Sequence, residues 1–210
     1  MRTVAVITPP AAIVTTAEAK KQLGVTGAGD DTYIDSLVAV ATQTIDGPNG
    51  WLGRAIGSQT LELRMDRFPC ADEISLPLPP LVSRTSVKYD DADGAEQTLS
   101  AEDYRLTGAG TDAGLIRLKS GKSWPNIIEQ AEAVRVRYVA GYGLAEAVPG
   151  PIKQAVLLMV QALYGLKDRN LFISSESVDG VASTSYVVSE NAGNVMRTAA
   201  EGLLAPYCIW

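Results

Sequence analysis

The segment that decides the fold is Val134-Arg135-Val136-Arg137-Tyr138-Val139, in which apolar and polar side chains alternate as in a half-buried β-strand. Residues 60–65 alternate in the same way. Asp93-Gly94 is a typical hairpin turn. Shorter strand candidates lie between these segments, at Glu73–Leu76, Thr85–Tyr89, Glu96–Leu99, Tyr104–Leu106 and Leu115–Leu118. The chain from Ser58 to Ala140 is therefore expected to form an antiparallel β-rich module.

Helical patterns flank this module on both sides. Thr15-Thr16-Ala17-Glu18 is a capping box, which predicts a short helix to Leu23. Apolar residues with helical spacing predict two longer helices, at residues 31–46 and 151–169. The first stripe is Ile34, Leu37, Val38, Ala41 and Ile45, and the second is Ile152, Ala155, Val156, Met159, Ala162, Leu163 and Leu166. A last helix is expected at Ala192–Leu204, and Ser174–Ser189 is expected to be a loop with a strand at Ser185–Val188.

These patterns predict an α+β fold, with a helical bundle core from both chain ends and an inserted antiparallel β-rich module. The expected divisions are 1–57 for the N-terminal helices of an oligomerising core, 58–140 for the module, and 141–210 for the C-terminal helices and a docking tail. The apolar stretch in residues 1–8 is followed by Pro9-Pro10 and is too short for a secretory signal. It therefore predicts an ordered leader strand. No apolar run reaches the roughly 18 residues of a membrane span, so the protein is expected in the cytoplasm when made.

Composition argues against several classes of function. The chain has a net charge of −6, whereas a protein that binds DNA tightly needs clustered positive charges to neutralise the phosphates. The chain has no histidine, which removes the commonest acid–base group and metal ligand. Its two cysteines, Cys70 and Cys208, form no C-x-x-C element. We therefore expect no enzyme, no catalytic residues, no metal and no cofactor.

For three motifs we favour a structural role over metal binding, catalysis or phosphate binding. Residues 90–94 fail the spacing of a calcium loop and predict a plain hairpin. The carboxylate pairs Asp30/Asp31 and Glu129/Glu132 are expected to cap helices or face solvent. Arg135 and Arg137 on one strand face could meet phosphate or a partner's carboxylates, although a solvated or intersubunit face is the preferred interpretation.

The C-terminal segment carries the candidate partner-binding residues, which are Leu203, Leu204, Pro206, Tyr207, Ile209 and Trp210. Chain ends usually fray unless they are held, yet this one ends in large apolar side chains. Their burial is favourable by several kcal/mol at about 25 cal/mol per Å². Docking on the chain's own helices and insertion into a neighbouring subunit or partner protein both remain open.

Several short motifs follow one another in a characteristic order along nearly the whole chain. They are Ile7-Thr8-Pro9-Pro10, Thr16-Ala17-Glu18-Ala19-Lys20, Asp46-Gly47-Pro48-Asn49-Gly50-Trp51-Leu52-Gly53-Arg54-Ala55, Gln59-Thr60-Leu61-Glu62-Leu63, residues 134–143, Pro151-Ile152-Lys153-Gln154-Ala155 and Leu203-Leu204-Ala205-Pro206-Tyr207. In order and spacing they resemble the head–tail connector (adaptor) family of long-tailed bacteriophages, prophages and gene transfer agents. Residues 174–190 depart most from the family pattern.

The resemblance implies a structural virion protein in the neck between head and tail. It implies a homo-oligomeric ring, of about twelve copies, that binds the portal protein, extends the DNA channel and presents a surface to the next neck or tail component. DNA would pass through the channel without sequence-specific binding. The alternative is a carbohydrate- or receptor-binding β-module of a tail tip, which predicts aromatic platforms on the β-rich module.

Overall fold

The computed structural model describes residues 1–167, 175–178, 182–185 and 190–209. The chain forms two compact units. The first comprises Met1–Ile13, Gln43–Pro149 and Cys208–Trp210, and the second comprises Val14–Thr42 and Gly150–Tyr207. In the described part of the chain, no helix is long and apolar enough to cross a membrane.

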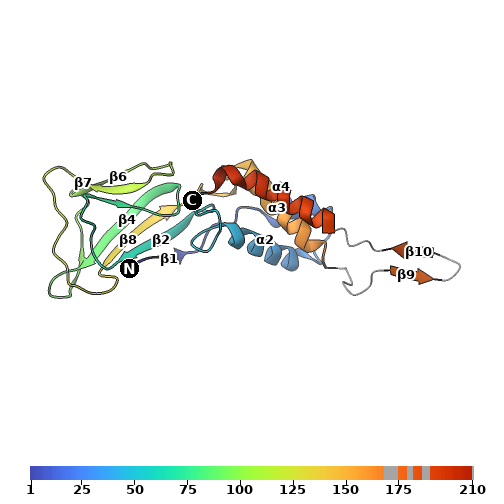
Figure 1. Ribbon diagram of the computed structural model, residues 1–210, viewed down its shortest axis with the longest axis horizontal. Helices are drawn as coiled ribbons and strands as arrows, with labels where there is room; N and C mark the ends of the chain where they lie inside the picture. Colours follow the sequence, from blue (N-terminus) through green and yellow to red (C-terminus); the bar gives the residue numbers. More distant parts are fainter. Residues whose placement is uncertain (168–174, 179–181, 186–189, 210) are drawn as a thin grey trace. The chain divides into compact units, whose positions relative to one another are not determined.

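Two antiparallel sheets build the first unit (Figure 1). The larger has the order β1-β2-β8-β4-β5, with β1 (Arg2–Thr8), β2 (Gln59–Met65), β8 (Val134–Ala140), β4 (Leu81–Asp90) and β5 (Glu96–Thr98). The smaller has the order β3-β7-β6, with β3 (Glu73–Ser75), β7 (Leu115–Leu118) and β6 (Tyr104–Thr107). A short 3₁₀ turn, η1 (Ala145–Ala147), follows β8.

Strand register explains the core of this unit. Leu61 lies opposite Tyr138, and Leu63 lies opposite Val136 on the paired strands β2 and β8. Because alternate residues of a strand point to opposite faces, these side chains share one face of the sheet. All four are fully buried, in one cluster with residues of the smaller sheet such as Ile116. The alternation at residues 134–139 thus places one face in a core and leaves the other face polar.

The second unit contains α1 (Thr16–Leu23), most of α2 (Asp31–Ile45), α3 (Gly150–Tyr164), α4 (Glu190–Leu204) and the 3₁₀ turn η2 (Ala205–Tyr207). It also holds the strands β9 (Ser175–Val178) and β10 (Ala182–Ser185), which pair with each other. Helix α3 packs on α4 and α1 (Figure 1). Helices from both ends of the chain therefore pack together, and the α+β prediction is confirmed.

The local signals at α1 have the predicted effect. Thr15 accepts a hydrogen bond from the Glu18 N–H through its side chain, and the Glu18 carboxylate accepts one from the Thr15 N–H. Gly24 ends the helix in the left-handed region, at φ +69°. Lys153 of α3 forms an ion pair with Glu18, which joins helices from opposite ends of the chain.

Some boundaries differ from the sequence predictions. Helix α3 ends at Tyr164 rather than near residue 169, because Gly165 follows and the next two N–H groups bond three residues back, to Leu163 and Tyr164. Strand β4 begins at Leu81, before the expected Thr85, because it accommodates two register shifts against β8. The leader strand is confirmed as β1. The expectation of a loop at Ser174–Ser189 is wrong for residues 175–178 and 182–185, which form the paired strands β9 and β10. Of the strand expected at Ser185–Val188, residue 185 ends β10 and the rest lies outside the described residues.

The predicted helical stripes are only partly buried. Ile34, Val38, Ala41 and Ile45 of α2 are buried, whereas Leu37 is half-buried. In α3 the buried residues are Ile152, Ala155, Val156 and Val160, whereas Met159, Ala162 and Leu163 are half-buried. Leu166 lies beyond the helix and is 49% exposed.

Candidate functional site: the tail, the polar sheet face and a pocket

The predicted partner-binding tail begins at the end of α4. Leu204 is only 1% exposed, so it belongs to the core of its own unit. Leu203, Tyr207 and Ile209 are half-buried, and Pro206 is exposed. Trp210 lies outside the described residues. The tail therefore has one inward residue and several that keep part of their surface accessible.

The end of the tail lies along the loop that follows α2. The N–H of Ile209 donates to the carbonyl of Leu52 at 2.9 Å, and the Cys208 Sγ lies 3.7 Å from the carbonyl oxygen of Trp51. Gly53 permits this approach, because a Cβ there would lie 2.8 Å from the Ile209 carbonyl oxygen. Gly53 also has φ +68°, a conformation that L side chains rarely adopt. Docking of the tail on a partner stays a prediction; within the chain it is held by this loop.

The loop is held in turn by a buried carboxylate, Asp46, which is 7% exposed. Its oxygens accept hydrogen bonds from the N–H groups of Ile56 and Gly57 and from the side-chain amide of Gln59. Burial raises the pKa of Asp46, and these hydrogen bonds oppose that rise only in part. Asp46 thus fixes the start of β2 relative to the loop that carries Trp51.

A buried arginine fixes the other end of this loop. Arg54 is 4% exposed, and its guanidinium contacts both carboxylate oxygens of Asp112 at 3.2 Å. It also donates to the Tyr142 hydroxyl at 2.7 Å. Residues 46–55, a prominent motif of the sequence, are therefore held at one end by hydrogen bonds to Asp46 and at the other by the Arg54–Asp112 ion pair.

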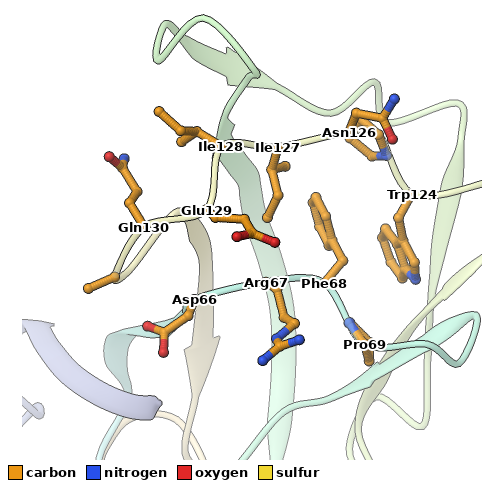
Figure 2. Close-up of a pocket in the computed structure, with 12 residues that line it drawn as sticks. Asp66, Arg67, Phe68, Pro69, Trp124, Asn126, Ile127, Ile128, Glu129 and Gln130 are labelled. Atoms are coloured by element: carbon orange, nitrogen blue, oxygen red, sulfur yellow. The ribbon is translucent and has the colours of Figure 1, made fainter.

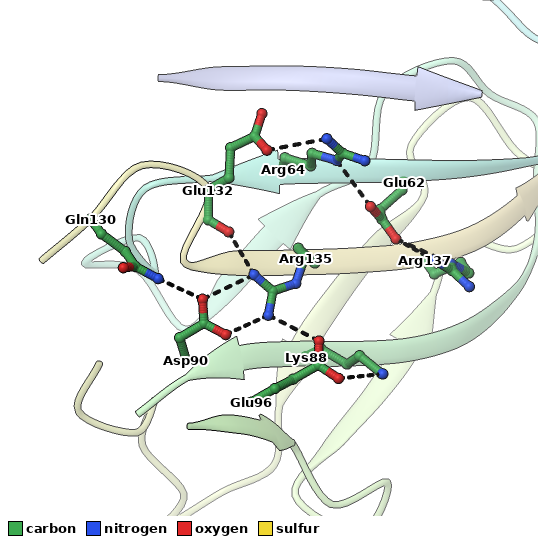
Figure 3. A network of polar contacts seen from close by, with 9 residues as sticks. All are labelled: Glu62, Arg64, Lys88, Asp90, Glu96, Gln130, Glu132, Arg135 and Arg137. Atoms are coloured by element: carbon green, nitrogen blue, oxygen red, sulfur yellow. Dashed lines mark hydrogen bonds and ion pairs between the residues drawn. The ribbon is translucent and has the colours of Figure 1, made fainter. Parts of the chain in front are cut away.

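The polar face of the larger sheet carries an extended ionic network (Figure 3). Arg135 contacts Asp90 and Glu96, and Arg137 contacts Glu62. The register places Arg64 directly opposite Arg135, an arrangement in which like charges would repel. The surrounding groups neutralise this repulsion through contacts that join Glu62, Arg64, Lys88, Asp90, Glu96, Gln130, Glu132, Arg135 and Arg137.

The network lowers the pKa of Glu62, Asp90 and Glu96. Burial opposes ionisation of Glu62, which is 6% exposed, yet hydrogen bonds from Arg137 and Arg64 outweigh it and lower its pKa. The hydrogen bond from Arg135 lowers the pKa of Asp90. Arg135 and Arg137 are thus engaged by carboxylates of their own chain, rather than presented to phosphate.

The candidate catalytic and metal motifs have structural roles. Asp30 accepts hydrogen bonds from Tyr164 and Lys167, Asp31 pairs with Lys20, and Glu132 pairs with Arg64. Asp91 accepts the N–H groups of residues 93 and 95, which confirms the hairpin between β4 and β5. Among the described residues, no group of three or more Cys, Asp or Glu side chains could hold a metal ion.

A pocket of about 630 Å³ on the first unit was not predicted from the sequence. The rings of Phe68 and Trp124 stack at one side, with centroids 4.8 Å apart and planes 5° from parallel. Figure 2 shows these rings beside Ile127, with Arg67 and Glu129 among the polar side chains nearby. The only signal in the sequence was Trp124-Pro125, in a stretch before β8 without helical or strand periodicity. The lining is mixed, with polar side chains such as Asp66 and Gln130 beside the aromatic rings.

Three solved structures that are similar to this chain come from one kind of particle. No family model matches the chain, and no curated protein matches it. Among solved structures, a chain from the neck of an empty gene transfer agent (GTA) particle, computed with C6 symmetry, has a TM-score of 0.71 and 20% identity. The match covers 99% of this chain and 96% of that one.

Two further structures agree over the same length. A chain in the virion of a native GTA particle has a TM-score of 0.69 and 22% identity, over 99% of this chain and 95% of that one. A chain in the neck of a native GTA particle, computed with C12 symmetry, has a TM-score of 0.65 and 20% identity, over 99% and 96%. At this level of identity, the likeness establishes that the protein shares the fold of these particle components.

Proposed function

We propose that the protein is a structural component of the neck of a phage-like or GTA particle and acts as a head–tail connector. It would form a ring beneath the portal, extend the DNA channel and provide the attachment surface for the next neck or tail component. The observation that carries the proposal is the fold match to a GTA neck chain over 99% of this chain and 96% of that one. A match over both full lengths leaves no large domain of either chain unaccounted for.

A ring of about twelve copies is consistent with the symmetries of the similar assemblies. Those necks were computed with sixfold and twelvefold symmetry, and a twelve-membered ring satisfies both. Head-to-tail contacts of one kind close such a ring by rotation. We assign the oligomerising core to the helices of both chain ends (1–57 and 141–210), and residues 58–140 to the inserted module.

The electrostatics support passage of DNA without a grip on it. The chain has a net charge of −6, and Arg64, Arg135 and Arg137 are neutralised by carboxylates of the same face. Phosphate binding needs cations that can exchange counterions for the nucleic acid backbone, and these three are already paired. The use of the charged motifs in ion pairs and turns likewise favours a structural protein over an enzyme.

We assign the contact with the portal, or with an adjacent subunit, to the tail residues Leu203, Leu204, Pro206, Tyr207, Ile209 and Trp210. Tyr207 and Ile209 are half-buried in the protomer and so retain surface for a partner. Leu204 would act indirectly, because its buried side chain fixes the point at which the tail leaves α4.

A receptor-binding module of a tail tip is the second candidate, and the Phe68–Trp124 pair is the observation that favours it. These two rings stack on each other, and Phe68 is only 9% exposed, so it offers no open face. Carbohydrate platforms need an open aromatic face, which makes this the weaker proposal.

Imaging of the purified protein by electron microscopy tests the connector proposal. Rings of twelve copies of the 22.2 kDa chain would have a mass of about 266 kDa, which mass photometry can measure. The protein should also occur at a ring's copy number in particles, at the head–tail junction. A protein found at the distal end of the tail would refute the connector proposal and support the second candidate.

A further inference from the structure

Strand β1 leaves one edge of the larger sheet open. It is the outermost strand, and among the described strands it pairs only with β2. Its other edge presents a row of backbone N–H and C=O groups over a strand of seven residues. Natural proteins usually protect such an edge with Lys, Pro or a very short strand. Within β1 the only charged residue is Arg2, at its start, and its side chain donates to the carbonyl of Ser75. Residues 3–8 contain neither Lys nor Pro, and Val6 and Ile7 are 44% and 38% exposed.

The pairing of β1 is regular over most of its length. Arg2 to Val6 pair in register with Met65 to Leu61 of β2, and a shift in register occurs only between Val6 and Thr8. A regular strand keeps its outward N–H and C=O groups in the alternating pattern that another strand can pair with. The open edge is therefore suited to receive a further strand.

The hairpin β9–β10 has two strands that pair only with each other among the described residues. Val178 pairs with Ala182 and Ser175 with Ser185, and no third strand joins them in the part of the chain that the structure describes. A two-stranded hairpin alone is at best marginally stable in water, and it needs another strand or an apolar face packed on a helix. The strands read Ser-Glu-Ser-Val and Ala-Ser-Thr-Ser, so their sequence supplies little apolar surface. Backbone pairing with another strand is the remaining source of stability.

We propose that one outer edge of this hairpin pairs with the open edge of β1 in a neighbouring copy of the chain. Each four-residue strand of the hairpin fits within the seven residues of β1. The inference rests on the proposed function in that it requires copies to assemble side by side.

We choose a second copy of the chain as the partner because the number of hairpins equals the number of open β1 edges. Every copy carries one hairpin and one open β1 edge, so all are used in a closed ring, whatever its size. The contact joins two different surfaces and is therefore head-to-tail, as a ring requires. Strand addition derives its affinity from main-chain hydrogen bonds and does not need the apolar area that the hairpin lacks.

Cross-linking between two single-cysteine proteins tests this pairing. In a background of Cys70→Ser and Cys208→Ser, which removes both free cysteines, one protein carries Val6→Cys on β1. The other carries Ser177→Cys on β9 or Ser183→Cys on β10. After mixing and treatment with a short bismaleimide, the two should form a mixed dimer. A control partner with Ser120→Cys, an exposed residue after β7, should give at least about tenfold less, because only the paired sites share a high effective concentration.

A yield no higher than that of the control overturns the proposal, whether or not rings form. Rings without this cross-link would leave the connector function standing and remove only this contact. If neither rings nor the cross-link formed, the result would count against the connector function and against this contact. A Val6→Cys site that reacts only with a different protein of the particle would overturn the choice of occupant.

A charge on the edge strand provides the second test. Val6→Lys should abolish the cross-link between Ile7→Cys and the hairpin cysteines and reduce ring formation, because a lysine at an edge disfavours strand addition. Its melting temperature should match that of the wild type, since Val6 is 44% exposed. Val82→Lys is the control, as Val82 is 50% exposed but lies on β4, at a register shift against β8, and not on the open edge of β1. Equal assembly of all three proteins would refute the pairing, as would normal rings from a variant with residues 175–185 replaced by a Gly/Ser linker.

Discussion

Replacement of Glu62 by Gln isolates the contribution of the charge at the centre of the polar sheet face. Glu62 is 6% exposed and accepts hydrogen bonds from Arg137 at 2.7 Å and Arg64 at 2.9 Å. Hydrogen bonds to charged groups contribute about 1.5–3 kcal/mol each when they are well buried. The Arg64 and Arg137 side chains are 34% and 42% exposed, so solvent screens both contacts. We therefore expect Glu62→Gln to lower the free energy of unfolding by about 1–2 kcal/mol in total.

The measurement is urea unfolding at pH 7, because urea adds no salt to screen the network. A melting experiment should show a decrease of roughly 3–6 °C for a chain of this size. Glu96→Gln is the matched control, since Glu96 belongs to the same network with a side chain that is 50% exposed. We expect its effect to be smaller than that of Glu62→Gln, because solvent screens the charge of an exposed side chain.

The pH dependence follows from the lowered pKa of Glu62. Its folded-state pKa lies below the ordinary value of 4.5, so the stabilisation is fully present above that value. It is lost as the pH falls through the folded-state pKa, where Glu62 takes up a proton and becomes neutral like glutamine. The difference between wild type and Glu62→Gln should therefore be constant from pH 8 to 6 and disappear in acid. A difference that persists unchanged at low pH, or an equal effect of Glu96→Gln, would refute this account.

Three further predictions concern the loop, the core and the tail. Gly53→Ala should destabilise the protein by more than Gly24→Ala. Both glycines have φ near +70°, but of the two only Gly53 would place a Cβ against another residue, 2.8 Å from the Ile209 carbonyl oxygen. Thermal melting of both variants gives the comparison, and equal decreases in melting temperature would contradict this account. Ile152→Ala, at 0% exposure, should cost about 2–5 kcal/mol in urea unfolding, whereas Leu163→Ala and Leu37→Ala, which are half-buried, should each cost less, and the reverse order would remove the core assignment. Deletion of Tyr207–Trp210 should leave the fold intact, because Leu204 stays in place, and should lower the melting temperature only slightly, through loss of the Ile209–Leu52 hydrogen bond. Particles should then contain DNA-filled heads without tails; a deletion that unfolds the isolated protein would show that the tail belongs to its own core.

Much of the fold could be predicted from local patterns, because those patterns reflect short-range physics. The alternation at Val134–Val139 specifies a strand with one buried face whatever lies beside it. The Thr15–Glu18 capping box predicts the first helix from hydrogen bonds between neighbours in the sequence. Asp93-Gly94 predicts its hairpin for the same reason.

Pairings over long range could not be predicted in this way. Arg135 was open to phosphate, a partner or solvent, because the sequence does not show that β4 would bring Asp90 within reach. Ile209 and Leu52 are joined by a backbone hydrogen bond, which no side-chain pattern encodes. Leu163 fits the helical stripe as well as Val160 does, and only the packing of neighbouring helices determines which of them is fully buried.

The position of β1 also has a consequence for the order of events during synthesis. Strand β1 is translated before its partners, because β2 begins only at residue 59 and β8 ends at residue 140. At about 5–20 residues per second, the ribosome needs on the order of ten seconds to deliver the partners that complete this sheet. During that interval α1 and α2 emerge as local elements, while the nascent β1 has both edges free.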